Sequence, residues 1–307
     1  MIYVGNAPCS WGNLEFQGLD EQSLDFRQLL DEIRESGYAG TELGDWGFLP
    51  IEPKTLHTEL ATRNLTMTGA FVPVAFSDSN CHADGKARAL RTAALLRNVA
   101  SETTPPFVVL ADDNGTHPAR TKTAGRITPD LALPKSKLEV FADGVNAIAQ
   151  AVTSQFGLRC VFHHHCAGFI ETPQEIADLM QLTDPNLVGL VFDTGHYVFG
   201  AGNTLENTVM DGVIRFADRI WYVHIKDCNL AIANEASSRE WGYFESVKNG
   251  VFCELGHGVV PFEILIGWLR TISYNGFVTV EQDVLPGMGS PMQSARRNRE
   301  FLAGLGL

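Results

Sequence analysis

The sequence lacks any run of basic residues, and its charge is strongly unbalanced. Of its 307 residues, 36 are Asp or Glu and 23 are Lys or Arg, which gives a formal net charge of −13 at pH 7. Nucleic acids are bound largely through clustered Lys and Arg side chains that neutralise phosphates. We therefore expect no nucleic-acid partner.

Cysteine patterns of the disulfide-rich or zinc-finger type are also missing. The six cysteines form no C-x-x-C pair, and a chain of this length does not need a disulfide framework. We expect buried thiols in a reducing compartment. These residues are Cys9, Cys81, Cys160, Cys166, Cys228 and Cys253.

Long hydrophobic runs are absent as well. No window of about 18 residues is apolar and uncharged, and the start, Met1 to Gly5, does not read as a basic region followed by an apolar stretch. We predict no membrane partner and a cytoplasmic location. The 45% hydrophobic content and the even composition predict one domain over residues 1–307.

Short apolar runs alternate with segments of helical period along the whole chain. Between the first two runs, Phe26, Leu29, Leu30 and Ile33 fall at i, i+3, i+4 and i+7, and Gly37 ends that predicted helix. The predicted strands are 3–8, 40–43, 66–72, 107–111, 159–163, 189–193, 221–225 and 277–281. The predicted helices are 25–33, 56–63, 86–99, 137–154, 173–182, 205–217, 261–273 and 291–302.

Strands that are separated by helices must pair in parallel. Eight such units in a chain of this length predict an α/β fold of the closed (β/α)₈ TIM-barrel type. An open doubly wound sheet is the alternative, but the first strand runs into residues 7–12 without a glycine-rich phosphate turn. We accordingly assign no residue to an organic cofactor. Two long connections, 112–134 and 227–252, are expected to form lids or substrate walls.

Four of the predicted strands, in the second half of the chain, lead into side chains that bind metals. His163, Asp193 and His224 are separated by 30 and 31 residues, about one strand-plus-helix unit, and Glu281 ends the last strand. Equivalent strand ends meet at one rim of a barrel. Imidazole and carboxylate ligands suit Zn, Mn, Co or Fe, so the pattern predicts a metal site.

Neighbouring polar residues extend this site. His163 and His165 share a strand face, with His164 expected to pack outside the barrel. His196 is expected to contact a substrate oxygen or only to cap the next helix. Asp283 is expected to orient a ligand imidazole.

These segments resemble the xylose-isomerase-like TIM barrels, a family of sugar isomerases, ketose epimerases, hydroxypyruvate isomerases, inosose dehydratases and endonuclease IV-type enzymes. The resemblance extends to the end of the chain and implies one divalent ion, Mn, Co, Zn or Mg, held by His163, Asp193, His224 and Glu281. The family has a Glu where this chain has His163. That His, with residues 40–44 and 252–258, looks most like the inosose dehydratase branch, although residues 69–73 lack the Lys-Trp pair expected there.

The resemblance implies a metal-dependent enzyme that acts on a sugar or cyclitol ketone through an enediolate, with the ion as Lewis acid. We expect an inosose dehydratase-like lyase or a sugar isomerase. The expected base is Glu281 or Glu42, and the expected proton donor is His165, His196 or Lys226. Substrate contacts are expected from Trp11, Trp46, Phe71, His165, His196, Arg239 and Trp241.

Other members of the family supply the alternatives. A ketose 3-epimerase uses two opposed metal-bound carboxylates, one of which His163 replaces here, and a hydroxypyruvate isomerase is a further alternative. The acidic composition weighs against a DNA repair enzyme of the endonuclease IV type. The retained ligand set weighs against a sugar-binding barrel without activity. The resemblance also implies a homo-oligomer.

Overall fold

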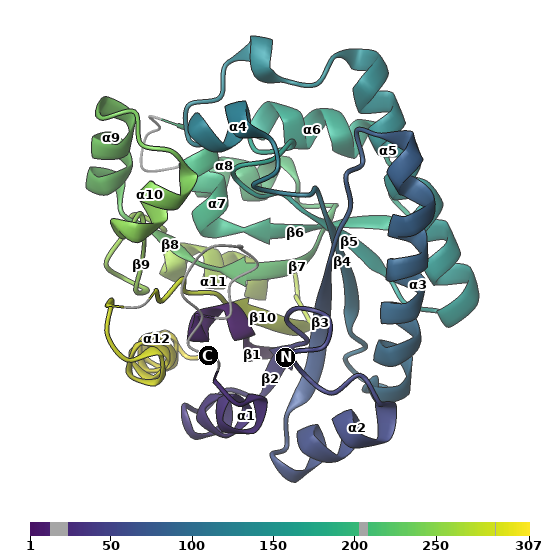
Figure 1. Ribbon diagram of the computed structural model, residues 1–307. Helices are drawn as coiled ribbons and strands as arrows, with labels where there is room; N and C mark the ends of the chain where they lie inside the picture. The colour runs from purple at the N-terminus through teal and green to yellow at the C-terminus, as the bar shows by residue number, and fades with distance from the viewer. Residues whose placement is uncertain (13–23, 203–207, 286) are drawn as a thin grey trace.

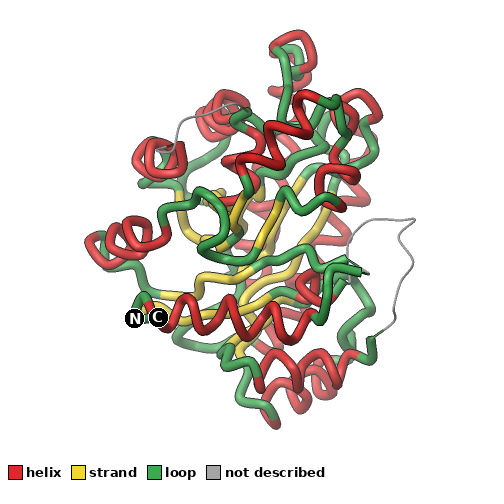
Figure 2. Tube along the Cα trace, turned by 90° about the vertical axis from the view of Figure 1, so that its left-hand side faces the viewer, coloured by secondary structure: helices red, strands yellow, loops and turns green. Residues whose placement is uncertain are grey.

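Eight parallel strands form a closed barrel, and the helices surround it (Figures 1 and 2). The structure is a computed structural model that describes residues 1–12, 24–202, 208–285 and 287–307. The strands follow in the order β1-β10-β7-β6-β5-β4-β3-β2 around the barrel, which confirms the predicted TIM-barrel fold. They are β1 (Ile2–Asn6), β2 (Gly40–Glu42), β3 (Thr66–Pro73), β4 (Phe107–Ala111), β5 (Cys160–His163), β6 (Val188–Asp193), β7 (Ile220–Ile225) and β10 (Gly276–Val280).

The outer helices follow the predicted order, with ends that differ by a few residues. The start expected for one helix, at Leu205, lies outside the described residues. These helices are α1 (Phe26–Glu35), α2 (Pro53–Thr62), α3 (His82–Val99), α5 (Lys135–Phe156), α6 (Pro173–Leu182), α8 (Thr208–Arg215), α11 (Phe262–Thr271) and α12 (Pro291–Gly304).

Side chains on the inner face of the strands fill the barrel and lead up to the predicted metal ligands. Val161, Val191 and Tyr222 belong to a buried cluster separate from the core between strands and helices. Alternate residues of a strand share a face, so the residues two positions later also point into the barrel. Those residues are His163, Asp193 and His224.

Two connections at the carboxyl ends of the strands contain secondary structure that the sequence did not reveal. After β7 the chain forms β8 (Asp227–Cys228), α9 (Leu230–Ser238), α10 (Tyr243–Lys248) and β9 (Phe252–Cys253), and β8 pairs with β9 antiparallel. After β4 it forms α4 (Pro118–Lys122) and the 3-10 helix η3 (Pro129–Leu131). Two further short 3-10 helices lie elsewhere: η1 (Pro8–Trp11) follows β1, and η2 (Ser79–Cys81) follows β3.

The carboxylate of Asp227 organises the segment that follows β9. It accepts hydrogen bonds from the backbone N–H groups of Cys228, Gly256, Gly258 and Val260, at 2.8–3.1 Å. A Cβ atom at Gly258 would lie 2.2 Å from Asp227 Oδ1, so only glycine fits there. The motif at residues 252–258 therefore shapes the rim of the barrel.

Among the described residues, no helix combines the length and the apolar composition that a membrane span requires.

Candidate metal centre

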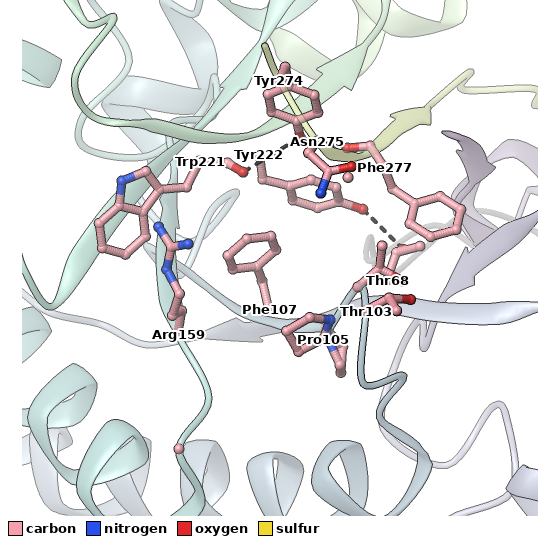
Figure 3. Close-up of a pocket in the computed structure, with 14 residues that line it drawn as sticks. Thr68, Thr103, Pro105, Phe107, Arg159, Trp221, Tyr222, Tyr274, Asn275 and Phe277 are labelled. Carbon is pink, nitrogen blue, oxygen red and sulfur yellow. Dashed lines mark hydrogen bonds between the residues drawn. The ribbon is translucent and has the colours of Figure 1, made fainter. Parts of the chain in front are cut away.

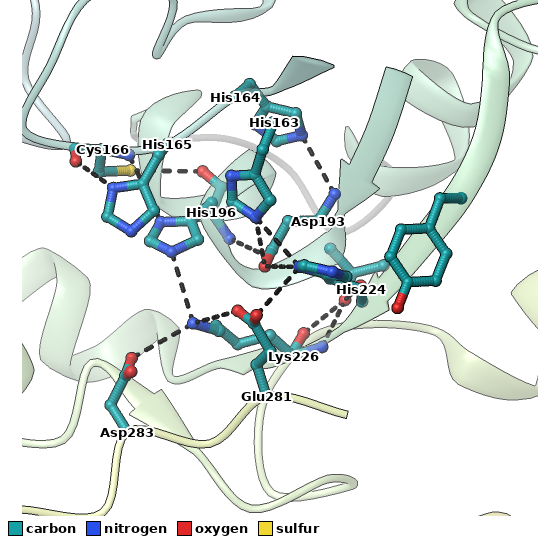
Figure 4. A network of polar contacts seen from close by, with 12 residues as sticks. His163, His164, His165, Cys166, Asp193, His196, His224, Lys226, Glu281 and Asp283 are labelled. Atoms are coloured by element: carbon teal, nitrogen blue, oxygen red, sulfur yellow. Dashed lines mark hydrogen bonds and ion pairs between the residues drawn. The ribbon is translucent and has the colours of Figure 1, made fainter. Parts of the chain in front are cut away.

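The four predicted metal ligands converge at the carboxyl end of the barrel. His163, Asp193, His224 and Glu281 each offer one ligand atom, and these atoms all lie within 4.8 Å of one another (Figure 4). The first three end or lie near the end of β5, β6 and β7, and Glu281 follows β10 directly. Four ligand atoms from four neighbouring elements can therefore surround a single ion.

The imidazole of His224 lies at the middle of the group. Its Nδ1 atom is 3.1 Å from His163 Nε2 and 3.2 Å from Glu281 Oε1. Asp193 Oδ2 lies 3.7 Å from His163 Nε2 and 3.9 Å from His224 Nδ1. Two imidazole nitrogens and two carboxylates thus face one another with no other side chain between them in the described site.

Asp193 has one oxygen committed to the fold and one that faces the centre. Its Oδ1 accepts the N–H of His196 at 2.8 Å and caps helix α7 (Thr194–Gly200). Its Oδ2 is buried and has no hydrogen-bond partner among the described residues. A buried carboxylate oxygen without a partner is costly, and a bound cation removes that cost. The donor set and this free oxygen fit a divalent ion.

The three consecutive histidines after β5 have different surroundings. His163 points into the barrel, whereas His164 packs against Phe192 and Tyr197, and its Nε2 accepts the N–H of Asp193 at 3.2 Å. The expected outward position of His164 is thus confirmed. His165 lies beyond the metal ligands, with Nδ1 2.5 Å from the carbonyl oxygen of Cys166.

His165 and His196 form a second layer of rings over the centre. Their ring centroids are 3.8 Å apart, and the ring of Tyr243 lies 5.5 Å from His165 and 6.3 Å from His196. Phe252 contacts the other side of His196, with centroids 4.7 Å apart. His196 does not cap a helix through its side chain, because the cap of α7 is Asp193.

Lys226 brings a buried ammonium group to the edge of the site. Its Nζ lies 3.2 Å from Glu281 Oε2 and 3.4 Å from both Asp283 Oδ2 and His196 Nε2 (Figure 4). The side chain is only 3% exposed. Asp283 therefore pairs with the ammonium group. The expectation that it orients a ligand imidazole is wrong.

Burial and mutual charge set the protonation of these groups. Burial alone would lower the pKa of Lys226, but Asp283, Glu281 and Asp193 hold it well above its ordinary value. Burial would raise the pKa of Glu281, yet His224 and Lys226 hold it well below the ordinary range. At neutral pH the pair is therefore an ammonium and a carboxylate.

The two rings of the second layer stay uncharged. Burial, followed by the charges of His163 and Lys226, lowers the pKa of His165 to about 3. Burial, followed by His165 and Lys226, holds the pKa of His196 well below its ordinary value. A neutral His196 accepts a hydrogen bond from the Lys226 ammonium.

Glu42 lies behind His224. Its Oε1 is 2.8 Å from His224 Nε2 and accepts the hydroxyl of Tyr222 at 2.8 Å. Glu42 is 4% exposed, and it contacts the Nε2 edge of the imidazole, whereas Glu281 contacts Nδ1. This carboxylate is thus part of the support of the centre.

The predicted substrate contacts divide into two groups. Phe71 lies beside the centre, its ring 6.2 Å from that of His163. His165 and His196 also lie at the centre, whereas the indoles of Trp11 and Trp46 have partners on outer helices. Trp11 donates its indole N–H to Glu32 of α1 at 2.7 Å, and Trp46 stacks with Arg91 of α3.

The connection between β8 and β9 contributes a different residue from the expected ones. Arg239 has a side chain that is 63% exposed and pairs with Glu235, and its guanidinium lies over Trp241. Tyr243, which is buried on α10, faces the site in their place. Helical spacing could have located it, because α10 presents Tyr243 and Val247 on one buried face.

The sequence matches the family model described as the xylose isomerase-like TIM barrel over residues 30–305. The chain belongs to this family. Among named relatives, the inosose dehydratase of Geobacillus kaustophilus is 29% identical over 301 residues, which cover 97% of this chain and 93% of the relative. The resemblance inferred from the sequence is confirmed.

Solved structures share the fold at low sequence identity. The probable 3-DHS dehydratase AsbF from Bacillus anthracis superposes with a TM-score of 0.69 at 13% identity and 99% coverage of both chains. The IOLI protein, solved with a bound zinc atom, gives a TM-score of 0.66 at 13% identity, covering 99% of this chain and 97% of that one. At this identity the likeness establishes the barrel and nothing finer.

Proposed function

We propose that this protein is a metal-dependent lyase that removes water from a polyol ketone of the inosose class. The observation that carries the proposal is the buried Lys226–Glu281 pair, 3.2 Å apart, at the edge of a four-residue metal centre. It places a proton acceptor and a proton donor side by side. The inosose dehydratase relatives, which match nearly the whole chain, support the substrate class.

His163, Asp193, His224 and Glu281 would hold one divalent ion. Two imidazoles among four ligands favour Zn, Mn or Co over Mg, which prefers oxygen ligands and water. When bound, such an ion would polarise the substrate carbonyl and so make the adjacent C–H bond more acidic.

Lys226 and Glu281 can complete the proton transfers of a dehydration between them. Glu281 accepts the proton from carbon, and Lys226 donates one to the departing hydroxyl, which leaves as water. Neutralising Glu281 removes one of the charges that keep Lys226 protonated, so the donor becomes more acidic at the step that needs it. Transfer of the proton across the 3.2 Å contact then restores both groups.

The second layer contributes binding and the exclusion of water. His165 and His196 are neutral rings that offer hydrogen bonds to substrate hydroxyls without adding charge. Tyr243 and Phe252 pack against them and help to bury them, so these rings shield the proton transfers from solvent.

His163 weighs against a 3-epimerase. Its imidazole occupies one position of the centre, which leaves Glu281 as the metal-facing carboxylate that can act as base beside Lys226. Inversion at one carbon by two opposed carboxylates is not available with this set. Isomerisation with a single base is the second candidate, because Glu281 and Lys226 could also return the proton to a neighbouring carbon.

The test is to incubate the protein with 2-keto-myo-inositol in D₂O, with Mn, Co or Zn added. We expect an unsaturated product that absorbs in the ultraviolet, formed only in the presence of metal. Deuterium incorporation at carbon without that product would identify an isomerase. A protein that binds metal but leaves both this substrate and simple ketoses unchanged would contradict the proposal.

We also propose that the protein works in the cytoplasm with metal and a small polyol as its ligands. Cys160, Cys166 and Cys228 are buried thiols, as is usual in a reducing compartment. The homo-oligomer implied by the resemblance stays a prediction, which sedimentation of the purified protein would test.

A further inference from the structure

The two nitrogens of His224 have opposite surroundings. Nδ1 faces the metal centre, at 3.1 Å from His163 Nε2 and 3.2 Å from Glu281 Oε1. Nε2 faces the interior of the barrel, at 2.8 Å from Glu42 Oε1. Which nitrogen carries hydrogen in the neutral ring is set by the partner of the other one.

Glu42 reaches His224 from across the barrel through a local irregularity of β2. The pairing register between β2 and β3 shifts between Thr41 and Glu42, and Glu42 pairs with Gly69. A Cβ atom at Gly69 would lie 3.7 Å from Glu42 Cδ and 3.2 Å from Val109 Cγ2. The shift and the missing side chain make room for the carboxylate inside the barrel.

No Lys or Arg side chain forms an ion pair with Glu42 in the described parts of the chain, where His224 is its partner. A carboxylate that is 4% exposed is costly unless hydrogen bonds or charges satisfy it. Its Oε1 meets two donors, the hydroxyl of Tyr222 and the imidazole of His224, both at 2.8 Å.

Two threonine side chains hold the hydroxyl group of Tyr222 in place. Its hydroxyl lies 3.0 Å from Thr68 Oγ1 and also contacts Thr279 Oγ1, so two threonine hydroxyls hold the phenol beside Glu42. The ring of Tyr222 lines a cavity of about 260 Å³ at the opposite end of the strands (Figure 3). The network therefore extends from that end of the barrel to the metal centre.

We propose that Glu42, held by Tyr222, is a positioning residue for the metal ligand His224. By accepting the Nε2–H it fixes the ring and its tautomer, so that the lone pair of Nδ1 points to the ion. Ligand histidines in proteins usually donate their second N–H to such an acceptor, and loss of it weakens metal binding by about 10–100-fold. This inference rests on the proposed function, because it requires that a metal binds at the four-residue centre.

The test compares metal affinity, by competition with a chelator for Zn, in the wild type and in graded variants. Glu42→Leu removes the acceptor and should weaken binding by about 10–100-fold. Glu42→Gln keeps an oxygen without the charge and should fall between Leu and the wild type. Tyr222→Phe, which leaves Glu42 in place but less fixed, should have a smaller effect of the same sign.

A matched control separates this role from stability. Tyr38 is fully buried, and its hydroxyl donates to the carbonyl oxygen of Ala295 in the outer helix α12 at 2.8 Å. Tyr38→Phe removes the same atom from a similar environment and should leave Zn affinity unchanged. Equal losses of affinity in Tyr38→Phe and Tyr222→Phe would show a general structural effect and overturn the inference.

Nitrogen-15 NMR of the wild type gives a readout that does not depend on any variant folding. In the Zn-loaded protein we expect hydrogen on Nε2 of His224 and metal on Nδ1, and the reverse arrangement would overturn the inference. A wild type that binds no Zn would overturn the proposed function together with it. Tight Zn binding that Glu42→Leu and Tyr222→Phe both retain would overturn the positioning role alone.

Discussion

Lys226 and Glu281 form a buried ion pair with Nζ and Oε2 3.2 Å apart. Each is also bound to the rest of the site, Lys226 through Asp283 and Glu281 through His224. The pair thus joins the metal centre to the groups that would handle protons. Lys226 needs these carboxylates to stay charged, since a buried ammonium without a partner would lose its proton.

Replacing Lys226 by Met should lower turnover strongly and leave metal binding intact. The substitution removes the proton donor, so kcat should fall by about 10²–10⁴-fold. The ion should bind at least as tightly, because Glu281 loses a competing cation. Steady-state rates and chelator competition on the same sample measure both effects.

The control for this variant is Arg239→Met. Arg239 was expected to contact substrate, but its side chain is 63% exposed and pairs with Glu235. We expect unchanged kcat and KM. A large loss of activity in Arg239→Met, with Lys226→Met still active, would contradict the assignment of roles.

Metal affinity should rise with pH. In the metal-free protein burial alone would lower the pKa of His224, but Glu281 and Glu42 raise it well above 6.5. The cation must therefore displace a proton from His224 at neutral pH, and one released proton makes the apparent affinity rise by up to about tenfold per pH unit. Titration calorimetry between about pH 6 and about pH 8, in buffers of different ionisation enthalpy, counts the protons; affinity independent of pH would be inconsistent with this arrangement.

The same shift fixes how the stability of the metal-free protein depends on pH. A group whose pKa is raised by folding stabilises the fold fully below its unfolded pKa, near 6.5 for a histidine, and loses that contribution as pH rises through the folded value. The contribution of His224 should thus decline above neutral pH without metal. Urea unfolding with and without Zn should show curves that diverge as pH rises.

Asp193→Asn should separate metal binding from helix capping. Asparagine is a good cap, so α7 should keep its first turn, whereas the loss of the carboxylate should remove the bound metal. Thr172→Ala, which deletes the capping box of α6, should cost about 1 kcal/mol and leave the metal in place. Elemental analysis and urea unfolding report the two quantities; full metal occupancy in Asp193→Asn would remove this residue from the centre.

The barrel itself could be predicted from the sequence because its signals are local. Each strand is a short apolar run next to an amphipathic helix, and eight repeats of that unit have few other solutions. The small elements after β7 were missed because their signals are not local. β8 and β9 have two residues each, and the contacts that stabilise them come from Asp227, across a span of about 30 residues.

The metal ligands could also be predicted, since strand ends converge in any barrel. The partners of those ligands could not. Whether a carboxylate such as Asp283 or Glu42 meets an imidazole or an ammonium depends on rotamers and on a one-residue register shift in β2. The expected substrate contacts of Trp11 and Trp46 could not be judged from the sequence either, because an indole at the rim packs equally well on a helix.

A buried ion pair outside the centre offers a test of stability alone. Arg120 is 2% exposed and makes two bonds to Glu175, at 2.7 and 2.9 Å. Arg120→Met should cost about 3–5 kcal/mol, since it leaves a buried carboxylate unpaired. Arg297, which binds Glu254 in the same bidentate manner but is 54% exposed, should cost less than about 1 kcal/mol when replaced by Met. Similar losses for the two in urea unfolding would contradict the burial argument.

The most direct measurement is the anomalous scattering of a crystal grown with manganese or zinc. We expect one ion per chain, bound by His163 Nε2, Asp193 Oδ2, His224 Nδ1 and a carboxylate oxygen of Glu281. A peak elsewhere, or a chain that remains metal-free while these four side chains bond only to one another, would contradict the central claim.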